Sequence, residues 1–122
     1  PSQLYAAGIK FCISNSESPF QTPHIRNLPY HAAKAASYGL SWKEALRSIT
    51  LSTAEILGVE DQVGSLEASK DATFFIADGD ILDIRTQVNM AFVQGRRVDL
   101  SDRHKTLYSK YRNKYKQKGI LE

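Results

Sequence analysis

The segment Arg26–Gly58 constrains the fold most, because its helix starts, apolar spacing and helix stops agree with one another. Asn27 precedes the first apolar-periodic residues as a helix N-cap would. Gly39 and Gly58 stand where left-handed helix stops are expected. Two capping boxes, in which a Ser oxygen accepts a backbone N–H and a Glu reaches back, predict further helix starts: Ser41-x-x-Glu44 and Ser52-x-x-Glu55. The segment therefore predicts three short helices joined by tight turns.

A short apolar run precedes this helical segment. Ile9–Ser14 follows a helix end at Gly8 and is typical of a buried strand in a β/α unit. Asn15–Ile25 is polar, contains two prolines and lacks periodicity, so it predicts a loop. Loops that follow parallel strands carry the chemistry of α/β proteins. We therefore expect functional side chains here, among Asn15, Ser16, Glu17, His24, Arg26 and Asn27.

The periodicity changes from helical to strand-like after Gly58. Ala72–Ala77 is rich in aromatic and β-branched residues, and apolar residues alternate through Val88–Phe92. Gln94-Gly95 is a hairpin-turn signal, so Arg96–Val98 begins a return strand. These strands are predicted to be antiparallel, unlike the first.

The end of the chain predicts a basic helix. We expect Ser101 to cap it and the helix to run to about Lys118. An apolar and aromatic stripe recurs at helical spacing: Leu107, Tyr108, Tyr111 and Tyr115. Such a stripe packs down and leaves Lys and Arg in water. The alternative, that aromatics interleaved with cations bind single-stranded nucleic acid, is weaker, so no nucleic-acid partner is expected.

Composition limits the classes of protein to which the chain can belong. The chain has 122 residues, is 42% apolar and 24% charged, and is long enough for one ordinary domain. No run of eighteen apolar residues occurs, so we expect no membrane partner. Cys12 is the single cysteine and reads as a small buried hydrophobe. It leaves the compartment open, with a slight preference for the cytoplasm. The chain begins at Pro1 in mid-pattern, so we expect residues upstream.

Several spaced motifs between Leu4 and Leu100 fit one known family. They are Arg26-Asn27-Leu28-Pro29-Tyr30, Glu44-Ala45-Leu46, Thr50-Leu51, Ala54-Glu55-Ile56-Leu57-Gly58-Val59, Val63-Gly64-Ser65-Leu66, Lys70-Asp71-Ala72, Asp78-Gly79-Asp80 and Ala91-Phe92-Val93-Gln94-Gly95-Arg96. Together they resemble the C-terminal region of imidazolonepropionase-like members of the metal-dependent amidohydrolase superfamily. The resemblance implies an α/β fold, namely the last strand and helices of a TIM barrel and C-terminal strands of a small β-sandwich, and the helix predicted above follows as a terminal helix. The corresponding parts are residues 1–58, 59–100 and 101–122.

The resemblance also implies a metal site whose ligands lie elsewhere. Family enzymes hold a divalent metal, with zinc the expected ion, through a His-x-His, a carboxylate or carboxylated Lys, two later His residues and a last-strand Asp. This sequence has no His-x-His, and its three His residues fall outside the family's ligand places: His24, His31 and His104. We therefore expect no metal ligand and no bound metal in this chain.

Glu17 is the nearest substitute for the missing last-strand Asp, one or two positions out of register. Its carboxylate could take a proton from an attacking water. An ordinary loop carboxylate is the simpler interpretation. His24 with Arg26 could grip an anionic substrate group, because Arg offers a fork of donors; the alternative is a plain surface loop. Asn15 and Ser16 are further candidate substrate contacts, and Asn27 could serve as both cap and contact.

Two functional hypotheses follow. In the first, the chain is the C-terminal part of a hydrolase that cleaves C–N bonds of a cyclic or peptide-like amide, a small-molecule substrate, and is inactive by itself. In the second, it is a non-catalytic binding or assembly module, or belongs to a superfamily member that has lost catalysis. Exposed edges and apolar faces also predict self-association.

Overall fold

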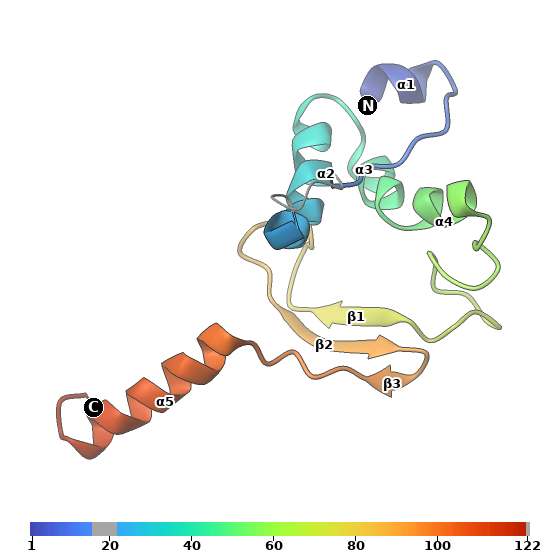
Figure 1. The fold of residues 1–122 in the computed structure, drawn as a ribbon. Coiled ribbons are helices and arrows are strands. Elements are labelled where there is room, and N and C mark those ends of the chain that lie inside the picture. Colours follow the sequence, from blue (N-terminus) through green and yellow to red (C-terminus); the bar gives the residue numbers. More distant parts are fainter. Residues whose placement is uncertain (16–21, 122) are drawn as a thin grey trace.

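A computed structural model describes residues 1–15 and 22–121 as short helices above a small sheet, with one long helix apart from both (Figure 1). The elements, in chain order, are α1 (Ser2–Ala6), the 3-10 helix η1 (Thr22–Asn27), α2 (Leu28–Ser37), α3 (Trp42–Ser48), α4 (Leu51–Leu57), β1 (Phe74–Ala77), β2 (Val88–Val93), β3 (Arg96–Arg97) and α5 (Arg103–Gln117). None of the helices in these residues is both long and apolar enough to cross a membrane.

The three predicted helices α2, α3 and α4 are confirmed. After α2, the Gly39 N–H bonds to the Ala36 carbonyl at 3.1 Å and the Leu40 N–H bonds to the Ala35 carbonyl at 3.2 Å. This is a Schellman stop, and it buries Leu40. The Ser41 hydroxyl accepts the Glu44 N–H at 3.3 Å, so the first capping box does start α3.

The second capping box is wrong. α4 begins at Leu51 with Thr50 in the N-cap position, so Ser52 lies inside the helix. The turn between α3 and α4 is short: the Thr50 hydroxyl donates to the Leu46 carbonyl of α3 at 2.9 Å. The new helix therefore starts before Ser52 can take the N-cap position. Glu55 instead pairs with Arg47 on α3, which ties the two helices together.

Small residues form the buried core. Ala32 and Ala35 of α2 face Ala45 of α3, so the two helices approach closely, and Leu40 closes their junction. Leu82 enters the same cluster from the segment between β1 and β2. This contact ties the helices to the sheet-bearing half of the chain.

The sheet confirms the antiparallel prediction. β1 pairs with β2, and β2 with β3, in the order β1-β2-β3. Phe74 pairs with Phe92 across β1 and β2, and their rings stack with centroids 5.0 Å apart. Gln94 (φ 49°) and Gly95 (φ 75°) make the predicted tight turn into β3.

The predicted strand Ile9–Ser14 is not a strand in this structure. The segment has no ladder partner among the described residues, and its Ile13 N–H bonds to the Ser48 carbonyl at the end of α3, at 3.1 Å. A strand needs a neighbouring strand in register, and an apolar run alone does not supply one. Phe11 and Ile13 nevertheless pack against the core, and Cys12 is half-buried.

The terminal helix is confirmed, but its cap and its packing differ from prediction. Asp102, not Ser101, caps α5 by accepting the Lys105 N–H at 2.8 Å, because the Ser101 hydroxyl is held by Asp99 at 2.7 Å. α5 has no buried residue. The prediction that its stripe packs down is therefore wrong: α5 extends away from the sheet and helices (Figure 1).

Candidate functional site

The structure brings together two of the predicted site residues. Asn15 lies at the end of the first described segment, and its side-chain amide donates to the His24 backbone carbonyl at 3.2 Å. His24 belongs to η1, which therefore begins beside the end of the apolar run. The imidazole of His24 takes no part in this bond and is exposed. Asn15 therefore fixes the backbone near His24 and leaves the ring accessible.

Of the other predicted site residues, the structure describes Arg26 and Asn27. Arg26 is exposed on η1. Asn27 is half-buried and precedes α2 in the N-cap position, as predicted, but its side chain makes no capping bond. Ser16 and Glu17 lie outside the described residues, so their roles stay predictions.

The described residues offer no metal cage. No group of three or more His, Cys, Asp or Glu side chains lies close enough together within residues 1–15 and 22–121. His31 is exposed on α2, and His104 is exposed at the start of α5. The donor set needed for a divalent ion is therefore missing from this part of the chain.

Two carboxylates with a lowered pKa belong to ion pairs, Glu55 between elements and Asp83 within one turn. Burial raises the pKa of Glu55, but Arg47 and Lys10 outweigh this and hold that pKa below its ordinary value. The Lys10 ammonium lies 3.4 Å from Glu55, so the pair joins the first segment to α4. Hydrogen bonds from Arg85 lower the pKa of Asp83 to about 2. Both shifts come from ion pairs that stabilise a helix contact and a turn, which is the structural kind of pKa perturbation.

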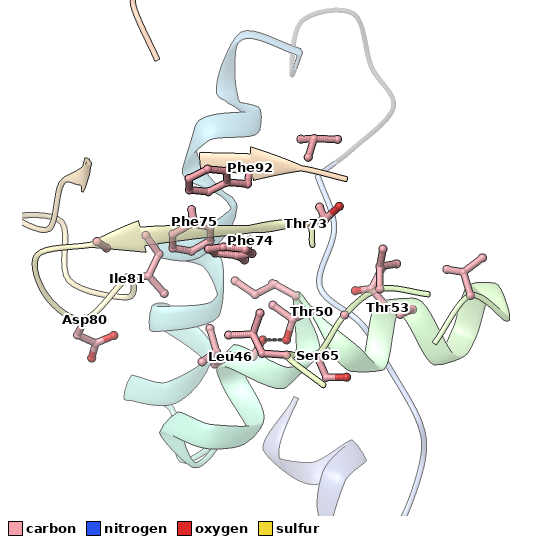
Figure 2. Close-up of a pocket in the computed structure, with 18 of the residues that line it drawn as sticks. Leu46, Thr50, Thr53, Ser65, Thr73, Phe74, Phe75, Asp80, Ile81 and Phe92 are labelled. Atoms are coloured by element: carbon pink, nitrogen blue, oxygen red, sulfur yellow. Dashed lines mark hydrogen bonds between the residues drawn. The ribbon is translucent and has the colours of Figure 1, made fainter. Parts of the chain in front are cut away.

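A large apolar groove lies between the helices and the sheet (Figure 2). This helix–sheet groove has a volume of about 940 Å³. Its walls come from α3, α4, β1 and β2, and they include Leu46, Ile49, Leu57, Phe74, Phe92 and Val93. Figure 2 shows Phe74 and Phe92 on the sheet side and Leu46 and Thr50 on the helix side.

At one end of the groove, the Asp80 carboxylate accepts two hydrogen bonds. The Trp42 indole N–H donates to Asp80 at 2.6 Å, and the same carboxylate accepts the Leu82 N–H at 2.9 Å. Asp80 therefore fixes the turn after β1 against the start of α3. The groove combines apolar walls with a carboxylate already engaged in hydrogen bonds. Apolar walls with few polar groups are typical of sites that take up an apolar group.

This groove was not predicted from the sequence. One local signal was present: Phe74 and Phe75 are adjacent in β1, so an aromatic side chain faces each side of the sheet. The sequence could not show that α3 and α4 stand far enough from that sheet to leave an open space.

Comparison with known proteins places the chain in a family. The amidohydrolase family model matches residues 13–100. Imidazolonepropionase from Shewanella baltica strain OS185 is 31% identical over 88 residues, which are 72% of this chain and 20% of that protein. Imidazolonepropionase from Shewanella putrefaciens is also 31% identical over 88 residues, with the same coverage. The chain spans about a fifth of the length of these curated relatives.

A solved structure agrees with the sequence match. The amidohydrolase from Thermotoga maritima MSB8 superposes with a TM-score of 0.72 and 29% identity, over 80% of this chain and 24% of that one. The sequence match begins within the apolar run and ends before α5, so it includes the helical block and the whole sheet. This chain belongs to the amidohydrolase family.

Proposed function

We propose that the chain is the C-terminal part of a metal-dependent hydrolase that acts on C–N bonds of a small-molecule amide, either cyclic or peptide-like. The observation that carries the proposal is the family match over residues 13–100, supported by the TM-score of 0.72 to a solved amidohydrolase. Imidazolonepropionases among the relatives favour a cyclic substrate. The whole protein's substrate remains part of the proposal, because the match spans a fifth of those relatives.

The metal belongs to the superfamily and not to the residues described here. Amidohydrolases generally use a divalent ion that activates water, and zinc is the ion we propose for this protein. The described residues do not fit such an ion, because they contain no cluster of three or more ligating side chains. We therefore assign the described residues no step at the metal, and we propose that the chain is inactive by itself.

The contribution of this chain is a scaffold and an accessible loop. Ion pairs from Glu55 to Lys10 and Arg47 hold the apolar run against α4 and α3. Asn15 then holds the backbone at His24, which leaves the His24 ring and the Arg26 guanidinium exposed on one short helix. In the proposed enzyme these two side chains bind an anionic group of the substrate.

The test uses the full product of the gene. We expect hydrolysis of five-membered cyclic amides or N-acyl amides that disappears on treatment with a chelator and returns with Zn²⁺. Arg26→Ala should raise KM about tenfold or more and leave kcat nearly unchanged, because it removes a charge-assisted contact made throughout the reaction. Lys34→Ala is the matched control, since Lys34 is an exposed cation on α2.

The same experiment weighs the second hypothesis, a non-catalytic binding or assembly module. A full product that lacks a His-x-His and two later histidines, and that shows no chelator-sensitive hydrolysis, would remove the enzyme and leave the module. A chelator-sensitive enzyme in which the Arg26 and Lys34 variants behave alike would keep the hydrolase and remove the substrate contact.

A further inference from the structure

α5 presents an ordered pattern that the proposed hydrolase does not use. Helical geometry places Leu107, Tyr111 and Tyr115 in one row, with Tyr108 and His104 beside it. Cations flank this stripe on both sides: Arg103, Lys110 and Lys114 on one, Lys105, Arg112 and Lys116 on the other. The opposite face is polar and uncharged, with Thr106, Ser109, Asn113 and Gln117. The helix therefore has one apolar face between two cationic rims.

This face has no partner among the described residues of its own chain. Tyr108 is 66% exposed, Tyr111 is 48% exposed, and no residue of α5 is buried. An isolated helix of this length is marginal in water, and its stability usually comes from packing of an amphipathic face. α5 begins after residue 100, where the family match ends.

Charge separates the tail (residues 101–122) from the body (residues 1–100). The tail has seven Lys and Arg against two carboxylates, whereas the body has nine Lys and Arg against eleven Asp and Glu. Two tails repel each other, so pairing of one α5 with another is unfavourable. A tail and a body attract each other. The charges therefore favour a contact between α5 and a body.

The helix–sheet groove has the complementary surface on the body. Its walls are mostly apolar and its volume is about 940 Å³, and Asp80 and Trp42 are among its lining residues. A convex helix with an apolar stripe fits a concave apolar groove, which is a common mode of helix recognition. At 1.5 Å per residue, α5 is about 22 Å long. After β3 the chain leaves the sheet, and α5 extends away from the sheet and the other helices (Figure 1).

We propose that α5 of one copy of this chain docks in the helix–sheet groove of a second copy. Leu107, Tyr111 and Tyr115 enter the groove, and the flanking cations lie along its rim. The contact is head-to-tail, so it makes a reciprocal dimer or a larger closed or open assembly. It goes beyond the proposed hydrolase and concerns the 122-residue chain.

Trp42 supplies a direct readout, because it is the single tryptophan and it lines the groove while half exposed. The untagged 122-residue chain is studied by sedimentation velocity and tryptophan fluorescence over a wide concentration range. We expect the assembly to grow with concentration and Trp42 emission to shift to the blue in parallel, since docking excludes water from the indole. Added salt should weaken both changes.

Paired variants test each side of the contact. Tyr111→Glu should weaken association about tenfold or more, because aromatic anchors dominate such interfaces. Asn113→Glu adds the same charge on the opposite face and should change it far less. On the groove side, Leu57→Glu should weaken association, whereas Ile84→Glu should not, although both residues are about 70% exposed. All four residues are exposed or on α5, so circular dichroism should show the body intact.

Several outcomes would overturn the proposal. A monomer at every concentration removes it, as does association that Tyr111→Glu and Asn113→Glu weaken equally. A Trp42 shift that depends on the tail but not on concentration would place α5 in its own groove. Binding to single-stranded oligonucleotides or to anionic phosphatidylserine vesicles, with no association between copies, would assign the stripe to a different partner.

Discussion

The body and the tail show that helical pattern and helical packing are separate properties. α3 has only seven residues but buries Ala45 and Ser48, whereas α5 has fifteen residues and buries none. Both begin with a side-chain cap, at Ser41 and Asp102. The difference is that α3 has neighbours on three sides, namely α2, α4 and the turn at Asp80. Local sequence forms each helix, and only the surrounding chain decides whether its apolar face is covered.

The largest effect expected from this comparison is on core leucines. Leu40 is 3% exposed at the junction of α2 and α3, so Leu40→Ala should lower the free energy of unfolding by about 2–5 kcal/mol through lost burial and a cavity. Leu107→Ala in α5, where the side chain is 37% exposed, should leave the unfolding of the body unchanged. Urea denaturation followed by Trp42 fluorescence, at concentrations low enough for a monomer, measures both. Equal losses would mean that tail and body pack together.

A smaller contrast comes from two glycines with left-handed backbone. At Gly64 (φ +95°) a Cβ would lie 2.7 Å from the Cβ of Ala54. Gly64→Ala should therefore cost about 2–4 kcal/mol from strain and overpacking. Gly119 (φ +67°) has no atom within 4 Å of such a Cβ, so Gly119→Ala strains the tail alone. The denaturation midpoint should fall for the first variant and stay constant for the second; a constant midpoint for both would contradict the packing at Gly64.

The smallest effect is the pH dependence of α5. The hydrogen bond from the Lys105 N–H lowers the pKa of Asp102 below its ordinary 3.8. The carboxylate therefore stabilises α5 above that ordinary value, and this stabilisation is lost as pH falls through the lowered pKa of the folded state. Asp102→Asn keeps a capping oxygen but does not titrate there. Far-UV circular dichroism should show an acid loss of helicity in the wild type that is smaller in this variant; identical curves would contradict the role of the cap.

Sequence reasoning succeeded where the structure is decided locally. The stop at Gly39, the cap at Ser41, the turn at Gln94-Gly95 and the antiparallel hairpin all depend on a few adjacent residues, and all are confirmed. Ser52 failed because the short connection from α3 leaves Thr50 to begin α4. Ile9–Ser14 failed as a strand because a ladder needs a partner strand that the described residues do not provide.

The candidate site was less predictable than the fold. The polar loop pointed to Asn15 and His24, and the structure joins them through the His24 carbonyl, which no side-chain pattern could indicate. The helix–sheet groove depends on the spacing between helices and sheet. The exposure of Tyr111 depends on the direction in which α5 extends from the rest of the chain. Both are long-range properties that periodicity does not contain. The roles of Ser16 and Glu17 stay predictions.

The central claim is that this chain has part of the amidohydrolase scaffold and that its residues 1–15 and 22–121 hold no metal cage. The most direct test is the zinc content of the 122-residue chain, purified without a histidine tag, incubated with excess Zn²⁺ and dialysed. Because the described residues contain no cluster of three or more ligating side chains, we expect far less than one zinc per chain. One tightly held zinc per chain, retained through dialysis, would contradict the account.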